Sequence, residues 1–186
     1  QVCVSPTRFY IQDAIHDRFV SALTERFGAL RLGNGLDPAT QMGPMANARR
    51  PDAIDALVAD ATARGGRLLT GGERIGNEGY FYRPTVISDL PLEARIMNEE
   101  PFGPVIATAR FSTFDEAVEQ ANRLPFGLAA YAFTENGRQA NRIGAALEAG
   151  MVGINVTRMA YADAPFQGVK HSGHGSEDGP EGLAAC

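Results

Sequence analysis

The sequence predicts an α/β fold in which a layered, mostly parallel sheet carries helices on both faces. Apolar, β-rich runs alternate along the chain with amphipathic helices, and such crossovers join parallel strands while covering both faces of a sheet. The chain has 186 residues, of which 44% are hydrophobic and 21% charged, so it is long and apolar enough to bury a core. No shift in composition marks a boundary, and we expect residues 1–186 to form a single domain.

The first part of the chain predicts a strand followed by a helix. Arg8–Gln12 is a short β-rich run, and Asp13 after it is a candidate N-cap. Apolar residues then recur at helical spacing and predict the face that packs on the core: Ile15, Phe19, Leu23 and Phe27.

The middle of the chain predicts a second helix and two strands. Its apolar face consists of Ile54, Leu57, Val58 and Ala61. This helix should stop at Gly65-Gly66, because glycine breaks a helical pattern. The runs 68–70 and 85–88 are β-rich and predict the two strands.

The last part predicts three strands with two helices between them. Residues 105–111, 128–133 and 151–154 are apolar runs typical of buried strands. Thr113-Phe-Asp-Glu116 is a capping box, which starts a helix expected to run to about Arg123. Ala140, Ile143 and Leu147 predict the face of the other helix. Residues 168–182 are rich in glycine and charge and predict irregular surface chain.

Charge and apolar patterning exclude several classes of partner. The formal charge is −5 with both signs interleaved, so no basic stripe is available for nucleic acid or for an anionic membrane surface. No apolar run approaches the roughly 20 residues of a membrane span, and Gln1–Tyr10 does not resemble a signal peptide. Cys3 and Cys186 form no disulfide framework, so we expect a reduced, cytoplasmic protein.

Cys3 is the first candidate for chemistry, because a thiolate is the best nucleophile that this sequence offers for a carbonyl carbon. Taken alone, a single cysteine is more often a small buried hydrophobic residue. A cysteine–histidine pair also stays open, since sequence distance does not place the histidines relative to the thiol.

Two loops are further candidates. In Asn98-Glu-Glu-Pro-Phe-Gly-Pro104, a proline-restricted turn follows two carboxylates, one of which could accept hydrogen bonds from ribose hydroxyls. A solvated pair of acids is the alternative. The other candidate is residues 164–173, where an apolar, aromatic loop at 164–168 comes before a glycine- and serine-containing loop at 170–173. An ordinary surface loop is the alternative.

The histidines do not predict a metal site. His171 and His174 have H-x-x-H spacing, but glycine and serine around them argue against a helix, and no third ligand is evident. His16 is expected on the surface of its helix.

Three stretches in this order resemble the NAD(P)-dependent aldehyde dehydrogenase superfamily. They are Gln1-Val-Cys3, Glu99-Glu-Pro-Phe-Gly-Pro104 and Pro165-Phe-x-Gly-x-Lys-x-Ser-Gly173, with support from Gly150-Met-Val-Gly-Ile-Asn155. The resemblance covers essentially the whole chain and implies the fold of the family's catalytic domain.

The resemblance also implies roles for single residues. Cys3 would be the nucleophile that forms a thiohemiacetal and then a thioester. Glu100 would accept hydrogen bonds from the nicotinamide ribose, and Phe102 would help to place the nicotinamide ring of NAD or NADP. Phe166 would line the substrate tunnel, and Asn155 would support the catalytic loop.

By the same resemblance, parts of the family's machinery lie outside this sequence. The cofactor-binding domain, the general-base glutamate and an oxyanion-hole amide would precede Gln1, and an oligomerisation strand would follow Cys186. We therefore expect the isolated chain to be inactive, and the full-length protein to be a homo-oligomer, either a dimer or a tetramer.

Three stretches resemble the branch that oxidises succinate semialdehyde, which implies a small semialdehyde substrate: Gln1-Val-Cys3, Pro165-Phe-x-Gly-Val-Lys170 and Gly179-Pro-Glu-Gly-Leu183. Tyr161 and Gln167 depart from that branch. Two other functions stay open. One is a non-catalytic interaction module that keeps the fold, and the other is a cysteine hydrolase or acyltransferase with a histidine near Cys3.

Overall fold

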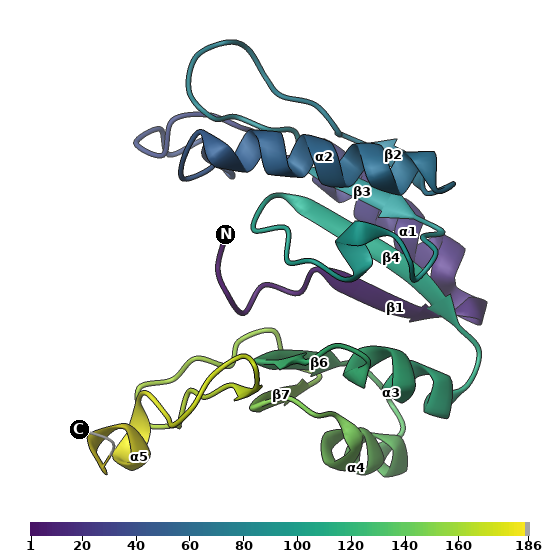
Figure 1. Cartoon of the computed structure of the whole chain (residues 1–186), viewed down its shortest axis with the longest axis vertical. Helices are drawn as coiled ribbons and strands as arrows, with labels where there is room; N and C mark the ends of the chain where they lie inside the picture. The colour runs from purple at the N-terminus through teal and green to yellow at the C-terminus, as the bar shows by residue number, and fades with distance from the viewer. Residues whose placement is uncertain (185–186) are drawn as a thin grey trace. The chain divides into compact units, whose positions relative to one another are not determined.

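The structure is a computed structural model that describes residues 1–184 (Figure 1). These residues divide into two compact units, Gln1–Ser112 and a second that begins at Thr113, each of which we describe by itself. The hydrogen-bonded strands of residues 1–184 form one four-stranded sheet and two two-stranded sheets. That residues 1–186 act as one domain stays a prediction.

Unit 1 is built around the four-stranded sheet, whose strand order is β1-β4-β3-β2. Its strands are β1 (Arg8–Gln12), β2 (Arg67–Thr70), β3 (Thr85–Ser88) and β4 (Val105–Phe111). β4 pairs in parallel with both β1 and β3, and β2 is antiparallel to β3. The predicted mostly parallel sheet is therefore confirmed for this unit.

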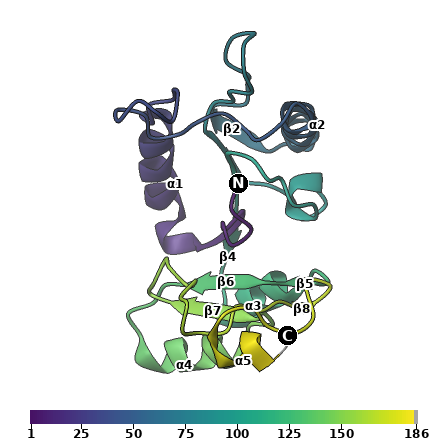
Figure 2. The same cartoon turned by 90° about the vertical axis from the view of Figure 1, so that its left-hand side faces the viewer.

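Helices cover both faces of this sheet, as the sequence predicted. They are α1 (Asp13–Gly28), α2 (Arg49–Ala63) and the short 3-10 helix η1 (Arg95–Met97). Figure 2 shows α1 and α2 on opposite sides of the strands. α1 begins directly at Asp13, so the expected N-cap is wrong by one residue: Gln12 takes the cap position without a side-chain hydrogen bond.

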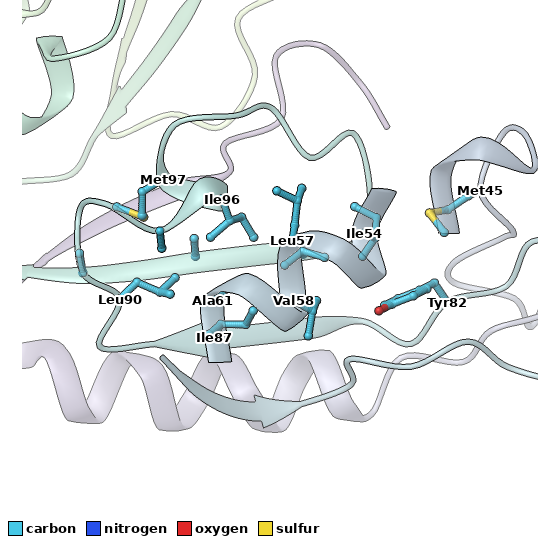
Figure 3. Close-up of a cluster of buried hydrophobic side chains, with 14 residues drawn as sticks. Met45, Ile54, Leu57, Val58, Ala61, Tyr82, Ile87, Leu90, Ile96 and Met97 are labelled. Atoms are coloured by element: carbon cyan, nitrogen blue, oxygen red, sulfur yellow. The ribbon is translucent and has the colours of Figure 1, made fainter. Parts of the chain in front are cut away.

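The core of unit 1 lies between α2, η1 and the sheet (Figure 3). The apolar face predicted for the second helix is confirmed, because Ile54, Leu57, Val58 and Ala61 are all buried. Ile54 is fully buried and lies on the first turns of α2, next to Met45. Because this face is buried, α2 is fixed on the sheet, and loops that contact its first turn are fixed with it.

The predicted core face of α1 is partly wrong. Ile15 is 42% and Phe19 40% exposed, whereas His16 and Val20 are buried. Residues 16 and 20 are one helical turn apart and face the sheet, and the row of Ile15 and Phe19 lies beside that face. His16 was expected on the surface, but its burial shows that the inward face of the helix is set by its docking angle.

Within residues 113–184, unit 2 contains two small sheets and three helices. Its elements are α3 (Phe114–Asn122), β5 (Phe126–Gly127), β6 (Ala129–Ala132), α4 (Gly137–Ala146), β7 (Met151–Ile154), β8 (Val169–Lys170) and α5 (Gly179–Ala184). β6 and β7 are parallel and joined through α4, while β5 and β8 are antiparallel. The predicted Thr113 cap is confirmed, because its hydroxyl accepts a hydrogen bond from the Glu116 amide.

Residues 168–182 are more regular than expected, because they contain β8 and the beginning of α5. A two-residue strand has no period of its own, and β8 exists because it pairs with β5. Within residues 1–184, no helix has both the length and the apolar character of a membrane span.

Candidate active site

Cys3 lies in a turn at the start of unit 1, before β1. The Ser5 amide donates a hydrogen bond to the Val2 carbonyl at 2.9 Å, which closes the turn around the cysteine. The thiol is free and exposed. The alternative of a small buried hydrophobic residue is therefore wrong, and the side chain is open to a reactant. We call residues 1–5 the thiol segment.

Gln1 ties the thiol segment to two other parts of unit 1. Its Nε2 donates to the Phe102 carbonyl at 2.8 Å, and its Oε1 accepts from the Ala46 amide, also at 2.8 Å. The first partner lies 101 residues further along the chain. The structure thus brings the segment that carries Cys3 against the loop that carries Glu100 and Phe102.

That loop, residues 98–104, is held from several sides, and we call it the carboxylate loop. The Asn98 side chain donates to the carbonyls of Leu92 and Ala94 at 2.7 and 2.8 Å. At its other end, the Pro104 carbonyl accepts from the Thr85 amide at 2.8 Å. The sequence prediction of a firmly held loop is consistent with these contacts.

The centre of the carboxylate loop has an unusual backbone. Phe102 has a φ of +42°, which residues other than glycine and asparagine rarely adopt. Pro101 before it is buried, and a Cβ on Gly103 would lie 2.6 Å from Ile54 Cδ1. Close packing on both sides therefore holds Phe102 in this conformation and leaves the residue 36% exposed.

The two adjacent carboxylates have different surroundings. Glu99 receives hydrogen bonds from Arg95 at 2.7 and 3.0 Å, which lower its pKa. Glu100 makes no hydrogen bond or ion pair among residues 1–184. Partial burial of its carboxyl raises the pKa of Glu100, and the charge of Arg50 acts in the opposite direction. Glu99 is thus occupied by an ion pair, while Glu100 can accept hydrogen bonds from a ligand.

Arg50, at the beginning of α2, contacts the same loop. One of its terminal nitrogens donates to the carbonyl of Pro101. The charge of this guanidinium therefore lies close to Glu100 while its hydrogen bond holds the backbone next to Phe102. Sequence reasoning did not single out Arg50, since no motif or spacing pointed to it.

A cavity of about 440 Å³ lies beside the thiol segment. Its walls include Gln1 and residues 5–7, Phe27 in the last turn of α1, Leu30 after α1, residues 42–45 and the start of β4. Cys3 does not line it. Tyr82, another wall residue, is buried, and this burial raises the pKa of its phenol. The walls are mostly apolar and border the segment that carries the thiol.

Phe166 and Asn155 belong to unit 2. Phe166 is half-buried, and its backbone exchanges two hydrogen bonds with Glu177, at 2.7 and 2.8 Å. The Asn155 amide group accepts from the Thr134 amide and donates to the Thr134 carbonyl, both at 2.9 Å. Asn155 therefore joins the end of β7 to the segment after β6. The roles implied for these two residues stay predictions.

Histidines do not complete a catalytic pair in unit 1. Its single histidine, His16, is buried in α1, and its Nδ1 lies 3.1 Å from an oxygen of Asp17. Cys3 and His16 form no hydrogen bond. In unit 2, the His171 ring packs edge-on against Phe126 at a centroid distance of 6.4 Å. Among residues 1–184, no three histidine, cysteine or acidic side chains gather as they would around a metal ion.

The carboxylate loop offers a hydrogen-bond acceptor and an aromatic ring, both of which suit a nicotinamide nucleotide. Glu100 offers carboxylate oxygens without a protein partner, as ribose hydroxyls require. Beside it, the partly exposed Phe102 ring offers an aromatic face or edge to a flat heterocycle. Both side chains come from one loop that is tied to the segment of the exposed thiol.

Comparison with known proteins gives relatives along the whole chain. A model of the aldehyde dehydrogenase family matches residues 1–186. The chain is 43% identical over 188 residues to 4-(hydroxymethyl)benzenesulfonate dehydrogenase of Comamonas testosteroni, covering 100% of this chain and 38% of that protein. It is 41% identical over 184 residues to succinate-semialdehyde dehydrogenase of Paenarthrobacter nicotinovorans, covering 99% and 41%.

Solved structures agree with these relatives. Lactaldehyde dehydrogenase of Escherichia coli superposes with a TM-score of 0.96 at 35% identity, over 100% of this chain and 39% of that chain. Betaine aldehyde dehydrogenase of Staphylococcus aureus, in complex with NAD+, gives 0.94 at 37% identity, over 99% and 37%. The chain thus spans about two fifths of the length of its relatives. Since the family model matches every residue and the fold agrees, the chain belongs to the aldehyde dehydrogenase family.

Proposed function

We propose that this chain is the thiol-bearing catalytic part of an NAD(P)-dependent aldehyde dehydrogenase, with Cys3 as the nucleophile. The observation that carries the proposal is the link through Gln1 between the segment of the exposed thiol and the carboxylate loop. Family membership supports aldehyde oxidation. The remaining machinery would belong to the longer protein.

In this proposal the thiolate sulfur of Cys3 bonds to the aldehyde carbon and gives a thiohemiacetal. NAD(P)+ would supply the acceptor for the hydride that leaves this carbon. Cys3 then carries a thioester, which water cleaves to the carboxylic acid while the thiol re-forms. The protons from the thiol and the water pass to a general base, which the family resemblance assigns to a glutamate upstream of Gln1.

Glu100 and Phe102 are proposed to hold the nicotinamide half of the cofactor. Glu100 would accept from the ribose hydroxyls, and Phe102 would limit the position of the ring. Phe166 of unit 2 is proposed to contact the substrate.

An anionic aldehyde such as succinate semialdehyde is the proposed substrate class. Two of the four relatives given above, the 4-(hydroxymethyl)benzenesulfonate and succinate-semialdehyde dehydrogenases, are named for compounds that carry a sulfonate or a carboxylate. Arg158 supports this class, because its guanidinium lies 5.2 Å from the centre of the Tyr161 ring and has no ion pair among residues 1–184. In Arg158→Met the KM for succinate semialdehyde should rise, because the guanidinium that attracts its carboxylate is gone. The KM for uncharged butanal should stay unchanged. An equal change for both would contradict the class.

The nucleophile is tested with Cys3→Ser and, as the matched control, Cys186→Ser in the full-length protein. The parent and the control should form NAD(P)H with succinate semialdehyde, and Cys3→Ser should not. Iodoacetamide should label Cys3 faster than Cys186. Activity that survives Cys3→Ser would refute the proposal, and a full-length protein inactive with every aldehyde would favour the interaction module.

Two further parts of the proposal concern the whole protein. The isolated 186-residue chain should form no NAD(P)H with any aldehyde, and robust formation would contradict this. The full-length enzyme is proposed to be a cytoplasmic homo-oligomer, dimer or tetramer, which light scattering on the purified protein would measure.

A further inference from the structure

We propose that Gln1 is a positioning residue, which sets the place of the Cys3 segment relative to Phe102 and thereby the rate of the chemical step. This inference rests on the proposed function of Cys3 and of the carboxylate loop. It goes further by giving the residue whose amide side chain joins the thiol segment to the carboxylate loop by one hydrogen bond and to Ala46 by a second.

The two hydrogen bonds of Gln1 have different partners and opposite polarity. Its Nε2 donates to the Phe102 carbonyl, and its Oε1 accepts from the Ala46 amide. Only an amide of this length offers both a donor and an acceptor at these places. The side chain therefore fixes the thiol segment between two loops, and Cys3 follows only two residues later.

The Phe102 carbonyl is a sensitive place for such a contact. Phe102 has a φ of +42°, and backbone in this region persists only where the surroundings hold it. The carbonyl just before it, that of Pro101, accepts from Arg50. Two successive carbonyls are thus held by side chains from other segments, one from the thiol segment and one from α2.

Loss of the Gln1 contacts should let the thiol segment and the loop move independently. A displacement of about 1 Å between reacting groups can cost on the order of 100-fold in rate, because the productive geometry is then rarely populated. The thermal midpoint should change little, since Gln1 is exposed and belongs to no core cluster.

The contact itself is tested by amide hydrogen exchange, measured by NMR on the 186-residue chain. In Gln1→Ala the Ala46 amide should exchange at least about 10-fold faster, because its acceptor is gone. In Gln1→Glu it should stay protected, since a carboxylate oxygen can still accept. The Met45 amide, which donates to the Tyr80 carbonyl at 2.8 Å, should be unchanged and serves as the internal control.

The functional consequence is tested in the full-length enzyme, with rates normalised to the amount of reactive thiol. Gln1→Ala and Gln1→Glu should both lower kcat by about 10-fold to 100-fold with the aldehyde KM unchanged, because both lack the donor to Phe102. Gln41→Ala is the matched control, since Gln41 Oε1 accepts from the Arg31 amide at 2.9 Å. It should leave kcat unchanged.

The outcomes separate this inference from the proposed function. Unchanged exchange of the Ala46 amide in Gln1→Ala, or an unchanged kcat in Gln1→Glu, would overturn the positioning role. A parent enzyme without aldehyde oxidation would overturn the proposed function, while the exchange result would still decide whether Gln1 holds the segment.

Discussion

Substitution of Gly103 tests whether the carboxylate loop is held by direct packing on α2. In Gly103→Ala the new Cβ would lie 2.6 Å from Ile54 Cδ1 and 2.8 Å from Ile54 Cγ1, where ordinary contacts start at 3.4 Å. Ile54 is fully buried and cannot move aside freely. We expect a loss of about 1–3 kcal/mol in the free energy of unfolding, as in other overpacked cores.

A double-mutant cycle identifies the cause of that loss. Ile54→Val alone should cost about 0.5–1.5 kcal/mol. It also removes Cδ1, the atom closest to the new Cβ. The double variant should therefore cost less than both single changes together, with a coupling of at least about 0.5 kcal/mol. The free energies come from urea unfolding followed by circular dichroism.

Gly35→Ala is the matched control, because a Cβ on Gly35 would meet no atom within 4 Å. Its effect should stay within about 0.5 kcal/mol. The reasoning is refuted if Gly103→Ala costs no more than this control, or if the cycle is additive to within about 0.3 kcal/mol.

Three other predictions follow from the contacts described above. Burial raises the pKa of Glu100 above its ordinary value of 4.5 in the folded protein, so folding favours the protonated carboxyl. As the pH rises from below 4.5 and passes the raised pKa, the parent should lose stability relative to Glu100→Gln. Thermal melts at several pH values would measure this, and a gap independent of pH would contradict it. Thr113→Ala should cost about 1 kcal/mol in urea unfolding through the lost cap on the Glu116 amide, whereas Thr113→Ser should cost less. Lys170→Met should leave the Asn122 carbonyl without the donor that lies 3.0 Å away. Proteolysis within residues 113–184 should then become faster, and an unchanged cleavage rate would argue against that contact.

Much of the local structure follows from the sequence. The strands at 85–88, 105–111 and 151–154 have the predicted bounds, since apolar runs between turn residues carry their own signal. The Thr113 hydroxyl caps its helix as expected, by accepting from the Glu116 amide. These features depend on neighbours a few residues away, which is the range that a sequence pattern describes.

Features that depend on docking were harder to predict. The row of Ile15 and Phe19 suggested the core face of α1, yet the helix turns His16 and Val20 to the sheet. Periodicity shows that a helix has an apolar stripe, but the orientation of the helix on the sheet decides which part of the stripe is buried.

The sequence by itself determined the α/β class, most elements and the candidates Cys3, Glu100 and Phe102. Only the tertiary structure decided that the Pro101 carbonyl accepts from Arg50 and that Glu100 has no ion pair among residues 1–184. It also decided that Gln1 joins the thiol segment to a carbonyl 101 residues away. The physical reason is that a hydrogen bond between distant segments depends on how both pack on α2 and the sheet, which no local pattern of residues encodes.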